Sequence, residues 1–317
     1  MILAVDTSIG SGVAVVAPDG VVLGEAESTN ALGHAEVIGT LIERALSDAG
    51  VGPDAITHVA AGMGPGPFTG LRIGIAAARA FALGRGIPVM PVVSHDAVAM
   101  EVLGILPAGG FAVTTDARRR ENAVSAYGAP DGWGLPHRVA GPELRPRDAD
   151  LSSDPLLAVV RQAQGPIASD APGAGDATKG VDAPRTTEEK HTSEGESGES
   201  SLRRAHPVPD ERDSGPFRPG SEQISEVLER IGARATLDAL AASRGVSAET
   251  LAESGVSPEE LRNASGGVFE AARIPIGVLG RLAAIRIRQG IVPDADEPLY
   301  LRSPDVKAPA PRKRVGS

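Results

Sequence analysis

Residues 1–26 read MILAVDTSIGSGVAVVAPDGVVLGEA, and their pattern gives the clearest indication of the fold. Three apolar runs, over residues 2–5, 12–17 and 21–26, are separated by residues that favour tight turns, such as Pro18-Asp19-Gly20. Runs of this length rich in valine and isoleucine predict strands. The chain is therefore expected to open with a three-stranded meander.

Helical and strand patterns then alternate. Apolar residues recur at helical spacing from residue 37 to 49, and Gly50 provides the stop. A buried-looking strand at 56–61, a Gly/Pro loop, a helix of small residues at 71–83 and a strand at 87–93 follow. The predicted order is βββαβαβ, an α/β arrangement with a mixed sheet covered on both faces.

The same order begins again near Phe111. Strands are predicted at 111–117, 123–127 and 138–144, with an apolar helix at 155–163. A duplicated lobe of this kind resembles the layout of the actin, hexokinase and Hsp70 ATPase (ASKHA) superfamily, whose lobes are ribonuclease H-like. We expect a first actin-like lobe over residues 1–105 and a second over 106–317.

The second lobe is expected to carry a long disordered insertion at residues 169–220. Between residues 171 and 204 the only bulky aliphatic residues are Val181 and Leu202. Such a segment cannot bury enough apolar surface to offset the entropy of ordering it. Helical spacing resumes at residues 224–231, and a last helix is predicted at 276–288, after Pro275.

Composition limits the possible chemistry. The 317 residues include no cysteine, which excludes disulfides and thiolate-held metals and suits a reducing cytoplasm. The N-terminus shows no secretory leader, and no apolar run is long enough to span a bilayer, so we expect a cytoplasmic protein without membrane contact. A net charge of -10 repels nucleic-acid phosphates. The basic tail 312–314 is interpreted as a solvated end.

Asp6, Thr7 and Ser8 follow the first strand and are candidates for nucleotide contact. Hydroxyl and backbone N–H groups can donate to phosphate, while a carboxylate holds the accompanying cation. The alternative is a hairpin in which Asp and Ser only cap the turn.

The segment Gly62-Met-Gly-Pro-Gly-Pro-Phe-Thr-Gly-Leu-Arg-Ile-Gly74 lies between a strand and a helix. It lacks the Gly-Lys-Ser/Thr ending of a P-loop and the glycine spacing of a dinucleotide fingerprint. Pro65 and Pro67 also remove two backbone donors. The favoured interpretation is a rigid turn that lets the helix pack closely through Gly70 and Gly74.

Together, Asp6-Thr-Ser8, Gly64-Pro-Gly-Pro-Phe-Thr-Gly-Leu-Arg-Ile-Gly74, Thr115-Asp-Ala-Arg118 and Glu297-Pro-Leu-Tyr-Leu-Arg302 resemble the TsaB family. The resemblance covers residues 1–126 and 276–302. Glu121 is followed by Asn122-Ala-Val, where family members often carry Glu-Val-Tyr.

The resemblance implies a noncatalytic scaffold that makes threonylcarbamoyladenosine in tRNA together with a homologous TsaD-like transferase and a TsaE-like ATPase. tRNA would be met indirectly, through the complex, and the chain could form a homodimer when alone. No cofactor is expected for the chain itself, although ATP or ADP at the subunit interface is left open.

The residues agree with a noncatalytic role. The six histidines form no H-x-x-x-H pair, so no metal site is expected. Ser11 lacks a nucleophile elbow, and adjacency of Ser94 and His95 does not by itself place their side chains in productive contact. The rival function is an independent ATP-dependent kinase or acyltransferase of the same fold, which would need phosphate loops in both lobes.

The helix at 71–83 is the predicted partner surface. It is apolar almost all round, so two faces should be buried. Ile73, Gly74, Ala77 and Phe81 are assigned to the sheet. Arginine side chains are costly against the apolar face of a sheet but favoured at protein interfaces. The side of the helix that carries the two arginines is therefore predicted to face the partner, and it consists of Arg72, Ile75, Ala76, Arg79 and Leu83.

Overall fold

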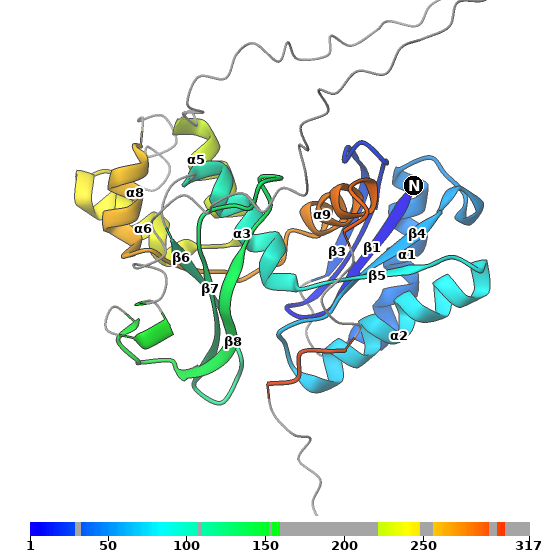
Figure 1. Cartoon of the computed structure of the whole chain (residues 1–317), viewed down its shortest axis with the longest axis horizontal. Coiled ribbons are helices and arrows are strands. Elements are labelled where there is room, and N and C mark those ends of the chain that lie inside the picture. The colour runs from blue at the N-terminus through cyan, green and yellow to red at the C-terminus, as the bar shows by residue number, and fades with distance from the viewer. Residues whose placement is uncertain are drawn as a thin grey trace, which may run out of the picture. The chain divides into compact units, whose positions relative to one another are not determined.

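The computed structural model describes residues 1–28, 33–106, 110–151, 154–156, 158, 221–247, 256–291 and 297–301. Figure 1 shows two groups of strands with helices beside them. None of the described helices is long and apolar enough to cross a membrane. The predicted insertion at 169–220 and most of the predicted helix at 155–163 lie outside the described residues.

The first sheet has the strand order β3-β2-β1-β4-β5. Its strands are β1 (Ile2–Asp6), β2 (Ser11–Val16), β3 (Val22–Ser28), β4 (His58–Gly62) and β5 (Val89–Val92). The first three pair antiparallel, whereas β4 and β5 add in parallel beside β1. The helices α1 (His34–Asp48) and α2 (Phe68–Arg85) supply the crossovers. The predicted βββαβαβ order is confirmed.

The second sheet repeats this plan with the order β8-β7-β6-β9. It contains β6 (Phe111–Asp116), β7 (Glu121–Tyr127), β8 (Arg138–Pro146) and β9 (Val268–Glu270). The meander is antiparallel, and β9 pairs in parallel with β6, as β4 does with β1. The duplicated α/β arrangement is therefore present. The helices α5 (Ser221–Ile231), α6 (Arg234–Arg244) and α8 (Pro258–Ser265) lie beside it.

Two helices connect the lobes. The helix α3 (Ser94–Ile105) follows the first sheet yet packs against β6 and α5, and α9 (Ile276–Arg288) follows the second sheet yet covers β1, β2 and β3. The sequence predicted α9 with the same bounds. It did not predict α3, because that segment shows no amphipathic period: its polar residues Ser94, His95, Asp96 and Glu101 are buried together with its apolar ones. The predicted lobe limits at 105 and 106 stay a prediction.

The strand alternation divides the core. Leu3 and Val5 of β1 point toward α1 and α2, in one apolar cluster. Ile2 and Ala4 point the other way, into a cluster that includes α9, α3 and Phe111 of the second sheet. Since neighbouring strand residues face opposite sides, the first sheet is buried on both faces, and one core continues from it into the second lobe.

Candidate functional site: the glycine segment, helix α2 and the interlobe groove

The loop after β1 is held by hydrogen bonds within the chain. The carboxylate of Asp6 accepts the backbone N–H of Ser8 at 2.7 Å and the hydroxyls of Ser8 and Ser94. The Thr7 hydroxyl donates to the carbonyl of Gly70 at 2.7 Å and accepts the N–H of Gly74 at 3.1 Å. Burial raises the pKa of the Asp6 carboxyl, while these hydrogen bonds act in the opposite direction.

Glycines of the 62–74 segment fit against this loop because they carry no Cβ. A Cβ on Gly62 would lie 1.8 Å from Asp6 Oδ2, and one on Gly74 would lie 2.2 Å from Thr7 Oγ1. A Cβ on Gly66 or Gly70 would also come within 3.0 Å of loop atoms, at 2.8 Å and 2.9 Å. The interpretation of this segment as a close-packing turn is confirmed. Nucleotide contact by Asp6, Thr7 and Ser8 stays a prediction.

Helix α2 presents an exposed stripe made of Thr69, Arg72, Ala76, Arg79, Ala80 and Leu83. Leu83 is 84% exposed. Four of the five residues predicted for the partner side therefore lie on the surface, namely Arg72, Ala76, Arg79 and Leu83.

Ile75 is the exception to that prediction. It is 4% exposed and packs in the core with Leu71, Ala78 and Ala82. At about 100° per residue these four share one side, so the buried stripe is rotated from the prediction. Gly74 is buried as predicted, but Ile73, Ala77 and Phe81 are only half buried.

An aromatic cluster covers the start of α2. The guanidinium of Arg72 lies 3.9 Å from the centre of the Phe68 ring, and its Nε donates to the hydroxyl of Tyr300 at 3.2 Å. The Phe68 and Tyr300 ring centres are 4.6 Å apart. Leu299 fixes this returning segment by donating its N–H to the carbonyl of Met63 at 2.8 Å. The late Glu297-Pro-Leu-Tyr motif thus belongs beside the glycine segment.

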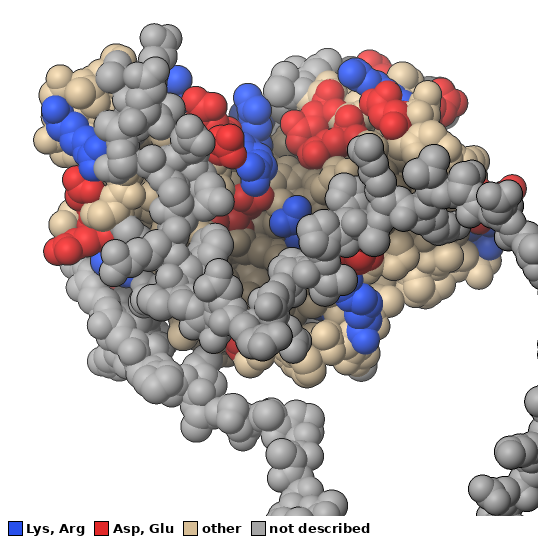
Figure 2. All heavy atoms as spheres, turned by 90° about the horizontal axis from the view of Figure 1, so that it is seen from above, with Lys and Arg blue, Asp and Glu red and all other residues tan. Residues whose placement is uncertain are grey.

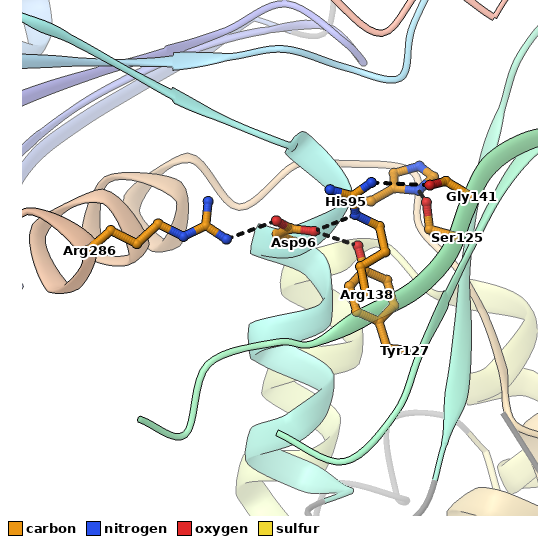
Figure 3. A network of polar contacts seen from close by, with 7 residues as sticks. All are labelled: His95, Asp96, Ser125, Tyr127, Arg138, Gly141 and Arg286. Atoms are coloured by element: carbon orange, nitrogen blue, oxygen red, sulfur yellow. Dashed lines mark hydrogen bonds and ion pairs between the residues drawn. The ribbon is translucent and has the colours of Figure 1, made fainter. Parts of the chain in front are cut away.

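A buried polar network surrounds the start of α3 (Figure 3). The Asp96 carboxylate accepts hydrogen bonds from Arg286 at 3.0 Å, Arg138 at 3.3 Å and the Tyr127 hydroxyl at 2.9 Å. These residues come from α9, β8 and β7 respectively. Burial, followed by the charge of Asp96, raises the pKa of Tyr127. The network ties both connecting helices to the second sheet.

The neighbouring His95 is fully buried and bridges the same region. Its two ring nitrogens lie 2.8 Å from the Ser125 hydroxyl and 2.9 Å from the Thr115 hydroxyl. Burial, together with the charge of Arg138, lowers the pKa of His95 to about 3. His95 is thus a neutral structural group, and Ser94 bonds to Asp6 and Ser8 rather than to the imidazole. Within the described ranges, no three His, Asp or Glu residues are placed to hold a metal ion.

A groove of about 480 Å³ separates the start of α2 from the turn between β6 and β7. Its lining is Gly66, Pro67, Phe68, Thr69, Thr115, Asp116, Ala117, Arg118, Arg119, Ala123, Leu144, Tyr300 and Leu301. On the face of the molecule seen in Figure 2, acidic and basic side chains are interspersed rather than forming one acidic field. The negative net charge therefore does not exclude local basic sites.

Two mixed sheets, in which β3-β2-β1-β4 and β8-β7-β6-β9 follow the same order, are joined by exchanged helices, and this arrangement defines an actin-like two-lobe protein. The family model described as "TsaD: tRNA N6-adenosine threonylcarbamoyltransferase" matches residues 22–129. Rv3421c of Mycobacterium tuberculosis is 39% identical over 161 residues, covering 50% of this chain and 71% of that protein.

TsaB of Haemophilus influenzae is 33% identical over 88 residues, which cover 28% of this chain and 37% of that protein. A crystal structure from Pseudomonas aeruginosa, of a protein similar to the peptidase YeaZ, aligns with a TM-score of 0.41 and 28% identity over 46% of this chain and 66% of that one. The chain belongs to one family with the mycobacterial protein, and it is TsaB-like over the part that the Haemophilus protein matches.

Proposed function

We propose that this protein is the noncatalytic scaffold and dimerisation subunit of a bacterial, cytoplasmic complex that forms N6-threonylcarbamoyladenosine in tRNA. It would pair with and activate a homologous TsaD-like transferase, with a TsaE-like ATPase joining the pair. The matched relatives named for this pathway cover only parts of the chain. They support the pathway, whereas the scaffold role rests on the surface of α2.

The observation that carries the proposal is the exposed stripe of α2. Leu83 is 84% exposed, and it lies in line with the small Ala76 and with Arg72 and Arg79. Interfaces favour apolar and arginine side chains, and a small residue lets a partner helix approach closely. Arg72 is already oriented by Phe68 and Tyr300, which limits the entropy that it loses on binding.

The test is pairing of the purified chain with the transferase subunit, followed by light scattering. We expect Leu83→Asp and Ala76→Arg to abolish pairing and to leave a folded monomer by circular dichroism. Val21→Asp is the matched control, since Val21 is an apolar side chain, 54% exposed, in the turn between β2 and β3. Normal pairing of both α2 variants would move the interface elsewhere, and α1 would be the next candidate.

A second measurement addresses catalysis. The isolated chain is expected neither to hydrolyse ATP nor to modify tRNA until the transferase is added. The hydroxyls of Thr7 and Ser8 are already engaged within the chain, which supports this expectation. ATP turnover by the isolated chain that disappears in Asp6→Ala would instead support the kinase or acyltransferase function. Turnover that survives in Asp6→Ala would point to a contaminating enzyme.

A further inference from the structure

The turn between β6 and β7 has an unusual backbone. Arg118, Arg119 and Arg120 have φ values of 65°, 55° and 61°. The N–H of Glu121 donates to the carbonyl of Arg118 at 3.1 Å, so that Arg119 and Arg120 occupy the two central positions of a tight turn with positive φ. Asparagine and glycine are the residues that such turns favour. We call residues 118–120 the arginine turn.

Three arginines are a costly choice for this backbone. The left-handed region is unfavourable for residues with a Cβ, and strained positions of this kind concentrate at functional sites. All three side chains are exposed, so packing of their stems does not account for them. The physical property that arginine adds here, and that asparagine or glycine lacks, is a cluster of fixed positive charges.

The arginine turn forms one wall of the 480 Å³ groove, through Arg118 and Arg119. The carboxylate of Asp116 lies at its base, but it forms ion pairs with both Arg147 and Arg118, so its negative charge is compensated. Phe68 and Tyr300 form the opposite wall, and the Arg72 guanidinium packs against both rings. The groove thus has a basic wall at the arginine turn and an aromatic wall opposite it, and Arg72 packs against the rings of that aromatic wall without lining the groove.

These features suit phosphodiesters better than an enclosed nucleoside triphosphate. A triphosphate is usually held by a cradle of backbone N–H groups. Here Pro65 and Pro67 have none, and the Ser8 and Gly74 N–H groups are used inside the chain. Exposed guanidiniums are instead the groups that contact nucleic-acid backbones.

We propose that the arginine turn binds phosphate groups of an RNA strand that runs along the groove. This proposal rests on the proposed function, since it assigns to the scaffold a direct contact with the RNA substrate of the complex. The tail at residues 312–314, by contrast, was interpreted from its sequence as a solvated end.

The test uses the full-length chain and a fluorescently labelled RNA hairpin with an anticodon loop, followed by anisotropy at increasing salt. Each phosphate contact contributes about 0.7–0.9 to the slope of log affinity against log salt, so that losing one contact costs on the order of tenfold at about 50 mM salt. Arg118→Ala and Arg119→Ala should each weaken binding by that factor and lower the slope by about one. Arg234→Ala, which removes an exposed charge from α6, should leave binding unchanged.

A double variant separates charge from folding. Arg119→Asn with Arg120→Gly should raise the melting temperature by a few degrees, because the new residues accept positive φ, while RNA binding falls. Unchanged RNA affinity in this variant, or an equal loss in Arg234→Ala, would overturn the proposal. So would stoichiometric displacement of the RNA by ATP, which would identify a nucleotide site.

Pairing with the transferase is measured on the same variants. The arginine variants should pair normally, and Leu83→Asp should lose pairing yet still bind the hairpin. Failure of the RNA contact therefore leaves the scaffold function standing, and failure of the α2 interface leaves the RNA contact standing.

Discussion

Gly74 lets α2 pack directly against the loop after β1, because glycine has no Cβ. A Cβ there would lie 2.2 Å from the Thr7 hydroxyl oxygen, which accepts the N–H of Gly74 and donates to Gly70. We expect Gly74→Ala to lower the free energy of unfolding by about 2–3 kcal/mol, through overpacking and lost hydrogen bonds. Gly84→Ala, on the same helix with no atom within 4 Å, should raise it by up to about 1 kcal/mol. Urea denaturation of both variants measures the difference, and equal effects would refute the close-packing role.

The buried His95 leads to a prediction of how the stability of the fold depends on pH. Its pKa is about 3 in the folded chain, against an ordinary value of 6.5. Between these values the unfolded chain binds the proton more readily, so stability is fully present above about pH 6.5 and falls as the pH drops toward 3. The expected slope is about 1.4 kcal/mol per pH unit.

The comparison that isolates this slope is His95→Gln, since every carboxylate titrates equally in both proteins. We expect the free-energy difference between wild type and variant to shrink between pH 7 and pH 4 in urea titrations. A difference that stays constant with pH would mean that the pKa of His95 is the same in the folded and the unfolded chain.

Elements with a clear period were predictable from the sequence, and those without one were not. The first meander, α2 and α9 were found because valine runs, glycine stops and Pro275 mark them. The helix α3 was missed because it has no separate polar face: ten of its twelve residues are buried, and they include the polar Ser94, His95, Asp96 and Glu101. The burial of Ile75 was not predicted for a related reason. Apolar residues lie on almost every side of α2, so the sequence does not show which side faces the core.

The helix α9 depends on small residues where it crosses the first sheet. A Cβ on Gly280 would lie 2.5 Å from a methyl of Val16 and 3.2 Å from the Cβ of Ala4. We expect Gly280→Ala to destabilise the fold by about 1–2 kcal/mol, since the strand side chains must move. Gly39→Ala on α1, where no atom lies within 4 Å, is the control and should be neutral or stabilising. Calorimetric melting of both variants decides whether α9 sits as closely on the sheet as described.

For the whole molecule, the fold could be predicted from the sequence, but the contacts between distant segments could not. Asp96, Arg138 and Arg286 belong to three elements and meet only because the lobes fold together. The spacing of these three residues along the chain does not predict that network. The groove has the same origin, since Phe68, Arg118 and Tyr300 come from regions far apart in sequence.

Residues 171–218 carry a prediction that comes from composition alone. Replacing them with a short Gly/Ser linker should leave the melting temperature and pairing with the transferase nearly unchanged, because a doubling of loop length costs only about 0.6 kcal/mol. A fall of several degrees, or loss of pairing, would show that the segment contributes to folding or function.

The position of α9 also sets an order of events while the protein is being made. The strands of the first sheet are complete at Val92, but the helix that covers one of its faces ends at Arg288, 196 residues later. At roughly 5–20 residues per second, the ribosome needs about 10–40 s to add that length. Throughout that interval Ile2, Ala4 and Val16 lack their native cover, so the nascent chain exposes an apolar sheet face that general chaperones can bind.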